Sequence, residues 1–208
     1  MDRREAERLK SGPLAPGEEP DAAALLARAF RDNPLNVAVI RGGPRRRLRS
    51  NLHSMRALLP MACRHGEVWV RREGTRVCAA LVGVPPLLHP LPPPPFAPRL
   101  RSLVGQGLGV ALRWARVFEE LDRLHPEEPH WYLGTFGVDP PVQGRGIGSS
   151  LLTEWLQRLD AEGGAVYLET DRAENVAFYE RAGFGALSET AVLGVPIWCM
   201  RRESRHPG

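Results

Sequence analysis

The feature that most constrains this chain is a glycine-rich loop placed between an extended apolar run and an amphipathic helix. Residues 130–138 are rich in aromatic and β-branched side chains, which is typical of a β-strand, and the prolines at 140–141 predict a turn after it. Apolar residues then recur at three- and four-residue steps from Ile147 to Leu159. This spacing predicts a helix with one face packed on a sheet.

The first turn of this helix contains residues that form helices poorly. Gly146, Gly148 and Ser149 would weaken it, unless a ligand has to approach the backbone closely. The first amides of a helix have no internal partners and carry partial positive charge. An anion such as a phosphate is therefore the expected ligand.

Three nucleotide-type loops compete for this segment, and spacing separates them. A phosphate-binding NTPase loop needs a lysine and a hydroxyl residue after its last glycine, but Ser149 and Ser150 follow Gly148. A dinucleotide fingerprint, which would indicate a nicotinamide-dependent reductase, needs its third glycine where Ser149 stands, although Glu169 lies near the place of the ribose-binding acid. Only about sixty residues follow the loop, too few for the repeated strand–helix units of a doubly wound sheet.

The segment 143–148, Gln-Gly-Arg-Gly-Ile-Gly, resembles a third kind of loop, Gln/Arg-x-x-Gly-x-Gly/Ala, which is typical of the GCN5-related N-acetyltransferase (GNAT) family. The segment 175–184, Asn-Val-Ala-Phe-Tyr-Glu-Arg-Ala-Gly-Phe, is similar to the family's next signature, at the expected distance. The layout is most similar to the puromycin N-acetyltransferase branch, with likeness at 29–30, 66–70, 128–131 and 198–200.

The resemblance implies an α/β (α+β) fold in a single domain. Its sheet would be mixed, mostly antiparallel and twisted, with a splayed central strand pair and helices on both faces. The implied activity is acetyl-CoA-dependent transfer of an acetyl group to a primary amine, by direct attack in a ternary complex. A small-molecule amine is favoured as acceptor, and a polyamine, an amino acid, an antibiotic or a protein N-terminus stays open. A non-catalytic acyl-CoA-binding or regulatory domain is the alternative.

The resemblance also assigns roles to individual residues. Main-chain amides of the loop would hold the pyrophosphate of the cofactor, with a further contact from the Arg145 side chain. The strand before the loop would pair with pantetheine, and the Val138 amide would stabilise charge on the carbonyl oxygen. Tyr179 would be the general acid for the thiolate. The full set of cofactor-binding candidates is Phe136, Gly137, Val138, Gln143, Gly144, Arg145, Gly146, Ile147, Gly148, Ser149, Asn175, Phe178 and Tyr179.

The general base is less constrained by the sequence. Glu169 is the preferred candidate, because a carboxylate at the end of a buried strand can have its pKa raised enough to accept an ammonium proton. Glu127, Glu128, His130 and a relayed water stay open.

Domain organisation follows from the remaining patterns. A domain at 20–203 is expected, with a proline-rich connector and inserted helices at about 85–125. The insertion is expected to cover the acceptor site. Tails are expected at 1–19, with a short strand around 13–16, and at 204–208. A helix capped by Asp21 is expected to end at Asn33-Pro34.

Composition excludes several other classes. The formal net charge of +4 is too small to indicate nucleic-acid binding. The three cysteines are scattered without metal-ligand spacing, so no metal is expected and a cytoplasmic protein is the default. No apolar run is long enough to span a membrane, so no membrane partner is expected. A monomer and a homodimer are equally compatible with the sequence.

Overall fold

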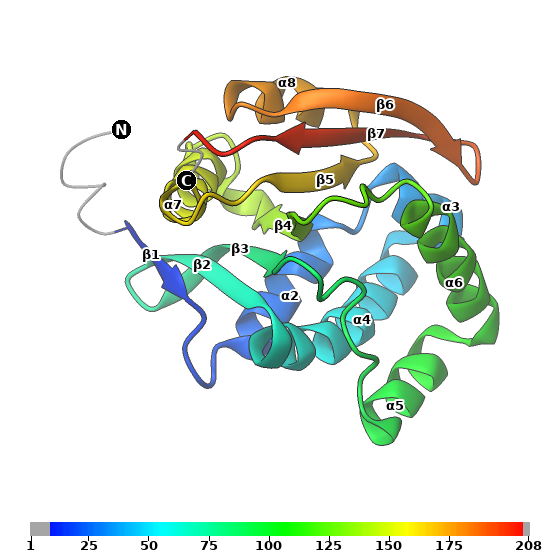
Figure 1. Cartoon of the computed structure of the whole chain (residues 1–208). Helices are drawn as coiled ribbons and strands as arrows, with labels where there is room; N and C mark the ends of the chain where they lie inside the picture. The colour runs from blue at the N-terminus through cyan, green and yellow to red at the C-terminus, as the bar shows by residue number, and fades with distance from the viewer. Residues whose placement is uncertain (1–8, 206–208) are drawn as a thin grey trace.

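A computed structural model describes residues 9–205 and shows a mixed sheet with helices on both faces (Figure 1). The strand order is β1-β2-β3-β4-β5-β7-β6, and every neighbouring pair is antiparallel except β4–β5. The expected mixed, mostly antiparallel sheet is confirmed, and a doubly wound parallel sheet is excluded. The strands are β1 (Leu9–Pro13), β2 (Glu67–Glu73), β3 (Arg76–Val84), β4 (Trp131–Val138), β5 (Val166–Thr170), β6 (Gly185–Val192) and β7 (Val195–Arg202).

The helices divide between the two faces of the sheet. Apolar residues of α7 and α8 pack on one face, and those of α2 and α4 pack on the other. Further along that second face, α3 and α6 cover β6 and β7. The helices are α2 (Glu19–Ala29), α3 (Pro34–Ile40), α4 (Pro44–His65), α5 (Phe96–Gln106), α6 (Leu108–Asp122), α7 (Ile147–Ala161) and α8 (Ala173–Arg181), with a 3-10 turn η1 at Pro140–Val142.

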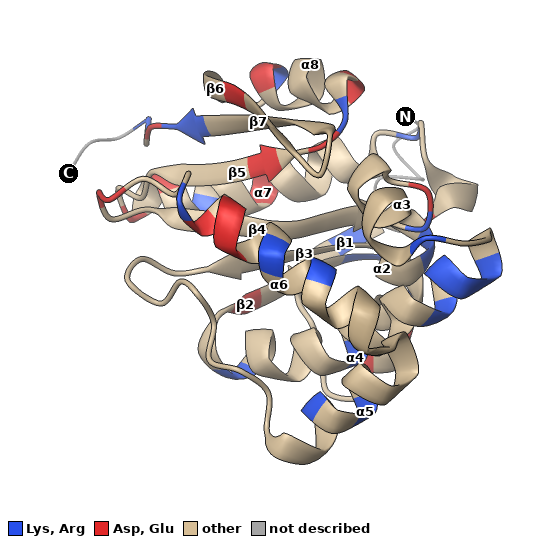
Figure 2. Ribbon diagram, turned by 90° about the vertical axis from the view of Figure 1, so that its right-hand side faces the viewer, with Lys and Arg blue, Asp and Glu red and all other residues tan. Residues whose placement is uncertain are grey.

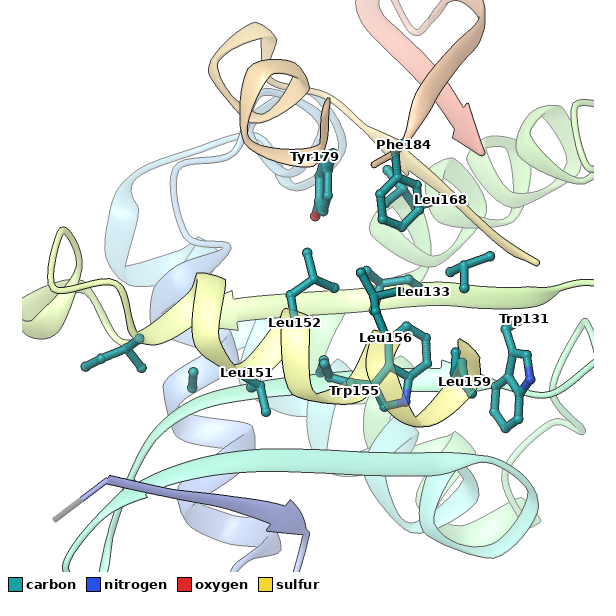
Figure 3. Packing of buried hydrophobic residues seen from close by; sticks show 14 of the residues in the cluster. Trp131, Leu133, Leu151, Leu152, Trp155, Leu156, Leu159, Leu168, Tyr179 and Phe184 are labelled. Carbon is teal, nitrogen blue, oxygen red and sulfur yellow. The ribbon is translucent and has the colours of Figure 1, made fainter. Parts of the chain in front are cut away.

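The helix α7 is held by its predicted apolar face. Leu151, Trp155 and Leu159 are each fully buried against the sheet, as Figure 3 shows. The Trp155 ring lies so close to β3 that a Cβ on Gly83 would stand 2.5 Å from it. Burial of each such side chain stabilises the fold by roughly 1.5–3 kcal/mol. This packing fixes the start of α7 against the middle of the sheet.

The central parallel pair separates after a short ladder. β4 and β5 pair only at Trp131–Val166 and Tyr132–Tyr167. Just beyond, the register between β3 and β4 shifts, which indicates a bulge in β4 around Gly134. The expected splay is confirmed, and it leaves the second half of β4 without a neighbour on its β5 side.

The N-terminal third differs in detail from expectation. The first strand lies at residues 9–13 rather than 13–16, within the segment expected to be a tail. Helix α2 begins at Glu19, ahead of Asp21, with a proline in its first turn. Helix α2 ends at Ala29 rather than at the expected Asn33-Pro34, and Pro34 instead starts α3, because proline fits the first turn of a helix, where its missing N–H costs nothing. Residues 1–8 and 206–208 of the expected tails lie outside the described residues.

Within residues 9–205, no helix is both long and apolar enough to cross a bilayer.

Candidate active site

A cleft of about 530 Å³ opens beside the unpaired half of β4. It runs from the first turn of α7, past β4, to α8 and the C-terminal end of α2. Its lining residues are Ala29, Phe30, Asn33, Phe136, Gly137, Val138, Val142, Gln143, Gly144, Gly146, Ile147, Gly148, Ser149, Arg172, Asn175, Phe178 and Tyr179. All of the cofactor-binding candidates except Arg145 are therefore brought together.

One end of the cleft is formed by main-chain amides. Gly144 and Gly146 adopt positive φ angles of 78° and 74°, a conformation that other residues rarely tolerate. Helix α7 starts directly after Gly146, without a side-chain cap, and its first internal hydrogen bond runs from the Ser150 amide to the Gly146 carbonyl at 3.0 Å. The amides of residues 147–149 are therefore free to bind an anion.

Gly148 keeps the first turn of α7 close to β4. A Cβ at this position would lie 2.9 Å from a methyl carbon of Val138 and 3.3 Å from the Phe136 ring. Such contacts are too close for a real side chain. The missing side chain lets the amide end of the helix and the open edge of β4 face the same cleft.

The open edge of β4 presents main-chain groups at two alternate residues. The Asp139 amide bonds the Cys78 carbonyl of β3 at 2.9 Å, which sets the alternation of the antiparallel ladder. The N–H and C=O groups of Phe136 and Val138 therefore point away from β3, into the gap left by β5. Sequence reasoning selected the Val138 amide alone, and the alternation adds the Phe136 amide. The Gln143 side chain donates a 3.0 Å hydrogen bond to the Val138 carbonyl.

The opposite wall of the cleft comes from α8. Tyr179 is 7% exposed, and its hydroxyl points from α8 toward α7 (Figure 3). Burial raises the pKa of Tyr179, and the charge of Asp171 raises it further, so the phenol keeps its proton at neutral pH. Asn175 donates a 3.1 Å hydrogen bond to the Thr170 hydroxyl, and the Phe178 ring stacks on Phe136 at 5.9 Å.

A buried carboxylate directly after β4, Asp139, anchors the strand that borders the cleft. Asp139 accepts hydrogen bonds of 2.8 and 3.0 Å from Arg28 of α2 and of 2.9 Å from Arg76 of β3. Burial acts to raise the pKa of Asp139, but the hydrogen bonds from the two arginines outweigh it and hold that pKa below its usual value. Asp139 thereby ties helix α2 and strand β3 to the end of the strand that carries the site.

Two predicted residues do not line the cleft. The guanidinium of Arg145 lies 3.1 Å from the Glu73 carboxylate of β2, so this ion pair directs the side chain away from the cleft. Glu169 lies on β5, two residues beyond the last pair with β4, and its side chain is 7% exposed. It therefore stands where the two strands begin to part, on the face that α6 covers.

The other candidates for the general base lie elsewhere. His130 Nδ1 is 2.7 Å from the Glu128 carbonyl oxygen, and the exposed Glu128 carboxylate is 3.3 Å from Arg201. Of the four side chains considered, only Glu169 stands beside the point where β4 and β5 separate.

Sequence reasoning missed part of the lining. Ala29, Phe30 and Asn33 belong to a segment, 29–34, that resembles a family corner beside the acceptor pocket, but the sequence did not assign them to the cofactor site. Val142 and Arg172 were not selected. Arg172 is a half-exposed cation beside α8, with Glu174 at 3.8 Å. It follows Asp171 directly after β5, and such positions at strand ends commonly carry binding residues, a signal that could have identified it.

Comparison with known proteins gives a consistent family assignment. The model of the "Acetyltransferase (GNAT) family" matches residues 92–184. The N-alpha-acetyltransferase RimI of Mycobacterium tuberculosis is 38% identical over 128 residues, which cover 57% of this chain and 78% of that protein. A mycothiol acetyltransferase of Beutenbergia cavernae is 34% identical over 107 residues, which cover 49% of this chain but only 33% of that protein.

The fold has solved counterparts. A Corynebacterium glutamicum structure described as histone acetyltransferase HPA2 and related acetyltransferase superposes with a TM-score of 0.72 at 23% identity, covering 96% of this chain and 98% of the other. At this identity the likeness concerns the fold alone.

Proposed function

This chain belongs to the GNAT family of acetyltransferases, and from that premise we propose that it acetylates a primary amine of a small molecule by direct attack in a ternary complex. Enzymes of the family use acetyl-CoA as cosubstrate, which supplies an acetyl thioester. The observation that carries the proposal is the gap between β4 and β5, with unpaired main-chain groups on its β4 side and free helix amides at one end.

The cleft fits this cosubstrate in charge and in hydrogen bonding. The amides of residues 147–149 and the loop at 143–146 suit the pyrophosphate, because they combine unpaired donors with the positive end of α7. The Phe136 and Val138 main chain suits the amide groups of pantetheine, as an added strand would. Asn175 is a further polar contact at the α8 side.

Three groups of this chain carry the chemistry in the proposal. An amide of β4, from Val138 or Phe136, donates to the carbonyl oxygen as that oxygen gains negative charge. Tyr179 donates its proton to the departing thiolate, a role supported by a phenol that stays protonated. Glu169 accepts the proton of the acceptor ammonium, supported by its place where the strands separate.

A small acceptor is supported by the cover over the second face of the sheet. Val110 and Val117 of α6 are buried against α3 and β7, so the segment between β3 and β4 closes part of that face. A long peptide would have to enter beneath this cover. The similarity to the puromycin branch stays a prediction.

A peptide N-terminus is the second candidate acceptor. The observation that favours it is the 38% identity with a protein named N-alpha-acetyltransferase, over most of that protein's length.

One assay tests both candidates. Release of free thiol from acetyl-CoA is measured against a panel of polyamines, amino sugars, aminonucleosides including puromycin, amino acids and short peptides with free N-termini. We expect turnover with a small amine and intersecting initial-velocity lines, which indicate a ternary complex. Turnover with peptides alone would reject the small-molecule acceptor, and parallel lines would reject direct attack. Acetyl-CoA binding without thiol release across the panel would instead support a non-catalytic acyl-CoA-binding domain.

A further inference from the structure

A cluster of buried imidazole and phenol rings surrounds Glu169 on the face that α6 covers. The His89 and His125 rings stack with centroids 3.8 Å apart and planes at 3°. The His125 ring also meets Tyr132 edge-on at 4.6 Å and Tyr167 at 4.8 Å. The Tyr167 hydroxyl donates to the Leu124 carbonyl at 3.3 Å, and Figure 2 shows the acidic C-terminal end of α6 beside β4 and β5.

The centre of this cluster holds polar atoms without hydrogen bonds. The side chain of His125 is 10% exposed and that of Glu169 is 7% exposed. Among the described residues, neither ring nitrogen of His125 nor Oε1 of Glu169 has a hydrogen-bond partner. Each such buried group costs roughly 1–3 kcal/mol. Three of them at one point are a sign of a functional site rather than of packing.

The distance between the two residues is short enough for a dyad. Nδ1 of His125 lies 3.5 Å from Oε1 of Glu169. This is slightly longer than a hydrogen bond, and catalytic contacts in structures without substrate often tighten when the substrate binds.

We propose that His125 is a positioning residue that acts through Glu169, so that the two side chains together serve as the general base. The inference rests on the proposed function. An N–H bond of the acceptor ammonium breaks, and its electron pair stays on the nitrogen for attack. The proton passes to Glu169 and from Oε1 to Nδ1 of His125, and it is then lost to solvent. No further reactant is needed.

The segment between β3 and β4 contains His125 and holds its ring in place beside Glu169. His89 comes from the proline-rich connector, and its Nε2 lies 3.0 Å from the half-exposed Asp122 carboxylate of α6. The stack on His89 fixes the plane of the His125 ring. Burial lowers the pKa of His89, and His125 lowers it further, so His89 is uncharged at neutral pH and does not repel a proton on His125.

Ionisable groups face the dyad from several elements, and a change in their protonation with pH can also affect the dyad. They are His89 of the connector, Asp122 of α6, His130 and Tyr132 of the β4 side, Tyr167 of β5, and Cys199 and Arg201 of β7. Burial and the adjacent Glu169 carboxylate raise the pKa of Tyr132, so this phenol stays protonated.

The test is the pH profile of kcat for His125→Gln at saturating acetyl-CoA and acceptor. Two interacting groups that share a proton titrate as a pair, so loss of the imidazole should displace the acid limb of the profile, whereas a His125 ring that only packs would leave it in place. We expect kcat at neutral pH to fall about tenfold or more, with KM for acetyl-CoA within about twofold of wild type. His130→Gln is the comparison variant, because it removes a neighbouring imidazole, 5.1 Å from the His125 ring, whose Nδ1 contacts the Glu128 carbonyl rather than Glu169, and its acid limb should move less than that of His125→Gln.

A second variant keeps the proposal testable if His125→Gln does not fold. Asp122→Asn changes a half-exposed side chain and weakens its ion pair with His89, which stacks on His125, so we expect a fall in kcat of about threefold with KM for acetyl-CoA unchanged. An acid limb of His125→Gln that coincides with wild type, or an equal shift in His130→Gln, would overturn the dyad. Failure of the wild-type protein to release thiol would instead reject the proposed function itself.

Discussion

The two halves of the candidate site differ in the kind of protein group that forms them. The cofactor cleft consists mainly of main-chain groups from one continuous stretch, residues 136–149, completed by α8. The proposed acceptor half consists of side chains that are far apart in sequence, with His89, His125 and Glu169 meeting beside the C-terminal end of α6. If the proposals hold, recognition of the cofactor is encoded locally, whereas the chemistry on the acceptor depends on how the inserted segment folds back onto the sheet.

Glu169→Gln should have the largest effect, and it tests the proposed acceptor half without changing the cofactor cleft. If the acceptor half acts through a carboxylate, kcat should fall about a hundredfold or more, because general-base catalysis contributes at least that much. KM for acetyl-CoA should stay within about twofold, since Glu169 does not line the cleft. Steady-state kinetics checks both values, and wild-type kcat in this variant would remove Glu169 from the role.

Substitution of Gly148 should change the cofactor cleft and leave the proposed acceptor half as it is. In Gly148→Val the new side chain would collide with Val138 and Phe136 and push α7 away from β4. We expect KM for acetyl-CoA to rise about tenfold or more, with Gly148→Ala giving a smaller rise. Isothermal titration with acetyl-CoA measures the effect directly, and unchanged affinity in both variants would contradict the cleft as the binding site.

Tyr179→Phe tests whether the Tyr179 hydroxyl protonates the thiolate of the cofactor once the acetyl group has passed to the acceptor. Removal of the phenol proton should lower kcat about tenfold, while the ring keeps its packing against Phe178 and Phe184. Acetyl-CoA affinity should be retained. Turnover equal to wild type, measured at several pH values, would show that another group protonates the thiolate.

Asp139 joins α2 and β3 to the end of β4, so its loss should affect stability rather than chemistry. Asp139→Asn removes the charge that accepts bonds from Arg28 and Arg76, and we expect a loss of about 1–3 kcal/mol. The folded pKa of Asp139 is depressed, so this stabilisation is present above the unfolded value near 4 and is lost as pH falls through the folded value. Urea unfolding at pH 7 and pH 3 should therefore show a difference between variant and wild type that shrinks at low pH.

The smallest effect is expected for Arg145→Gln. Because its guanidinium pairs with Glu73, we expect KM for acetyl-CoA to change by less than about threefold. Glu73→Gln is the matched control, since it removes the charge of the same ion pair from the β2 side. A much larger rise in KM for Arg145→Gln would indicate that the side chain leaves Glu73 when the cofactor binds.

The sequence by itself determined the half of the site that depends on local geometry. Gly144, Gly146 and Gly148 at fixed spacing, followed by the apolar face of α7, define an anion site whose parts are neighbours along the chain. The role of Tyr179 came from the resemblance of residues 175–184 to the family's signature, and helical periodicity added only that Asn175, Phe178 and Tyr179 share a face. Sequence reasoning assigned Arg145 to the cofactor, since nothing local shows that β2 offers Glu73.

Only the tertiary structure decided which atoms of β4 are open and what surrounds Glu169. The first depends on where the β4–β5 ladder ends, and the second on a connector and helix that return to the sheet from the segment between β3 and β4. Both are contacts between distant parts of the chain. Periodicity and spacing describe a residue's neighbours along one element, but the side chains that meet across elements are set by packing of the whole domain.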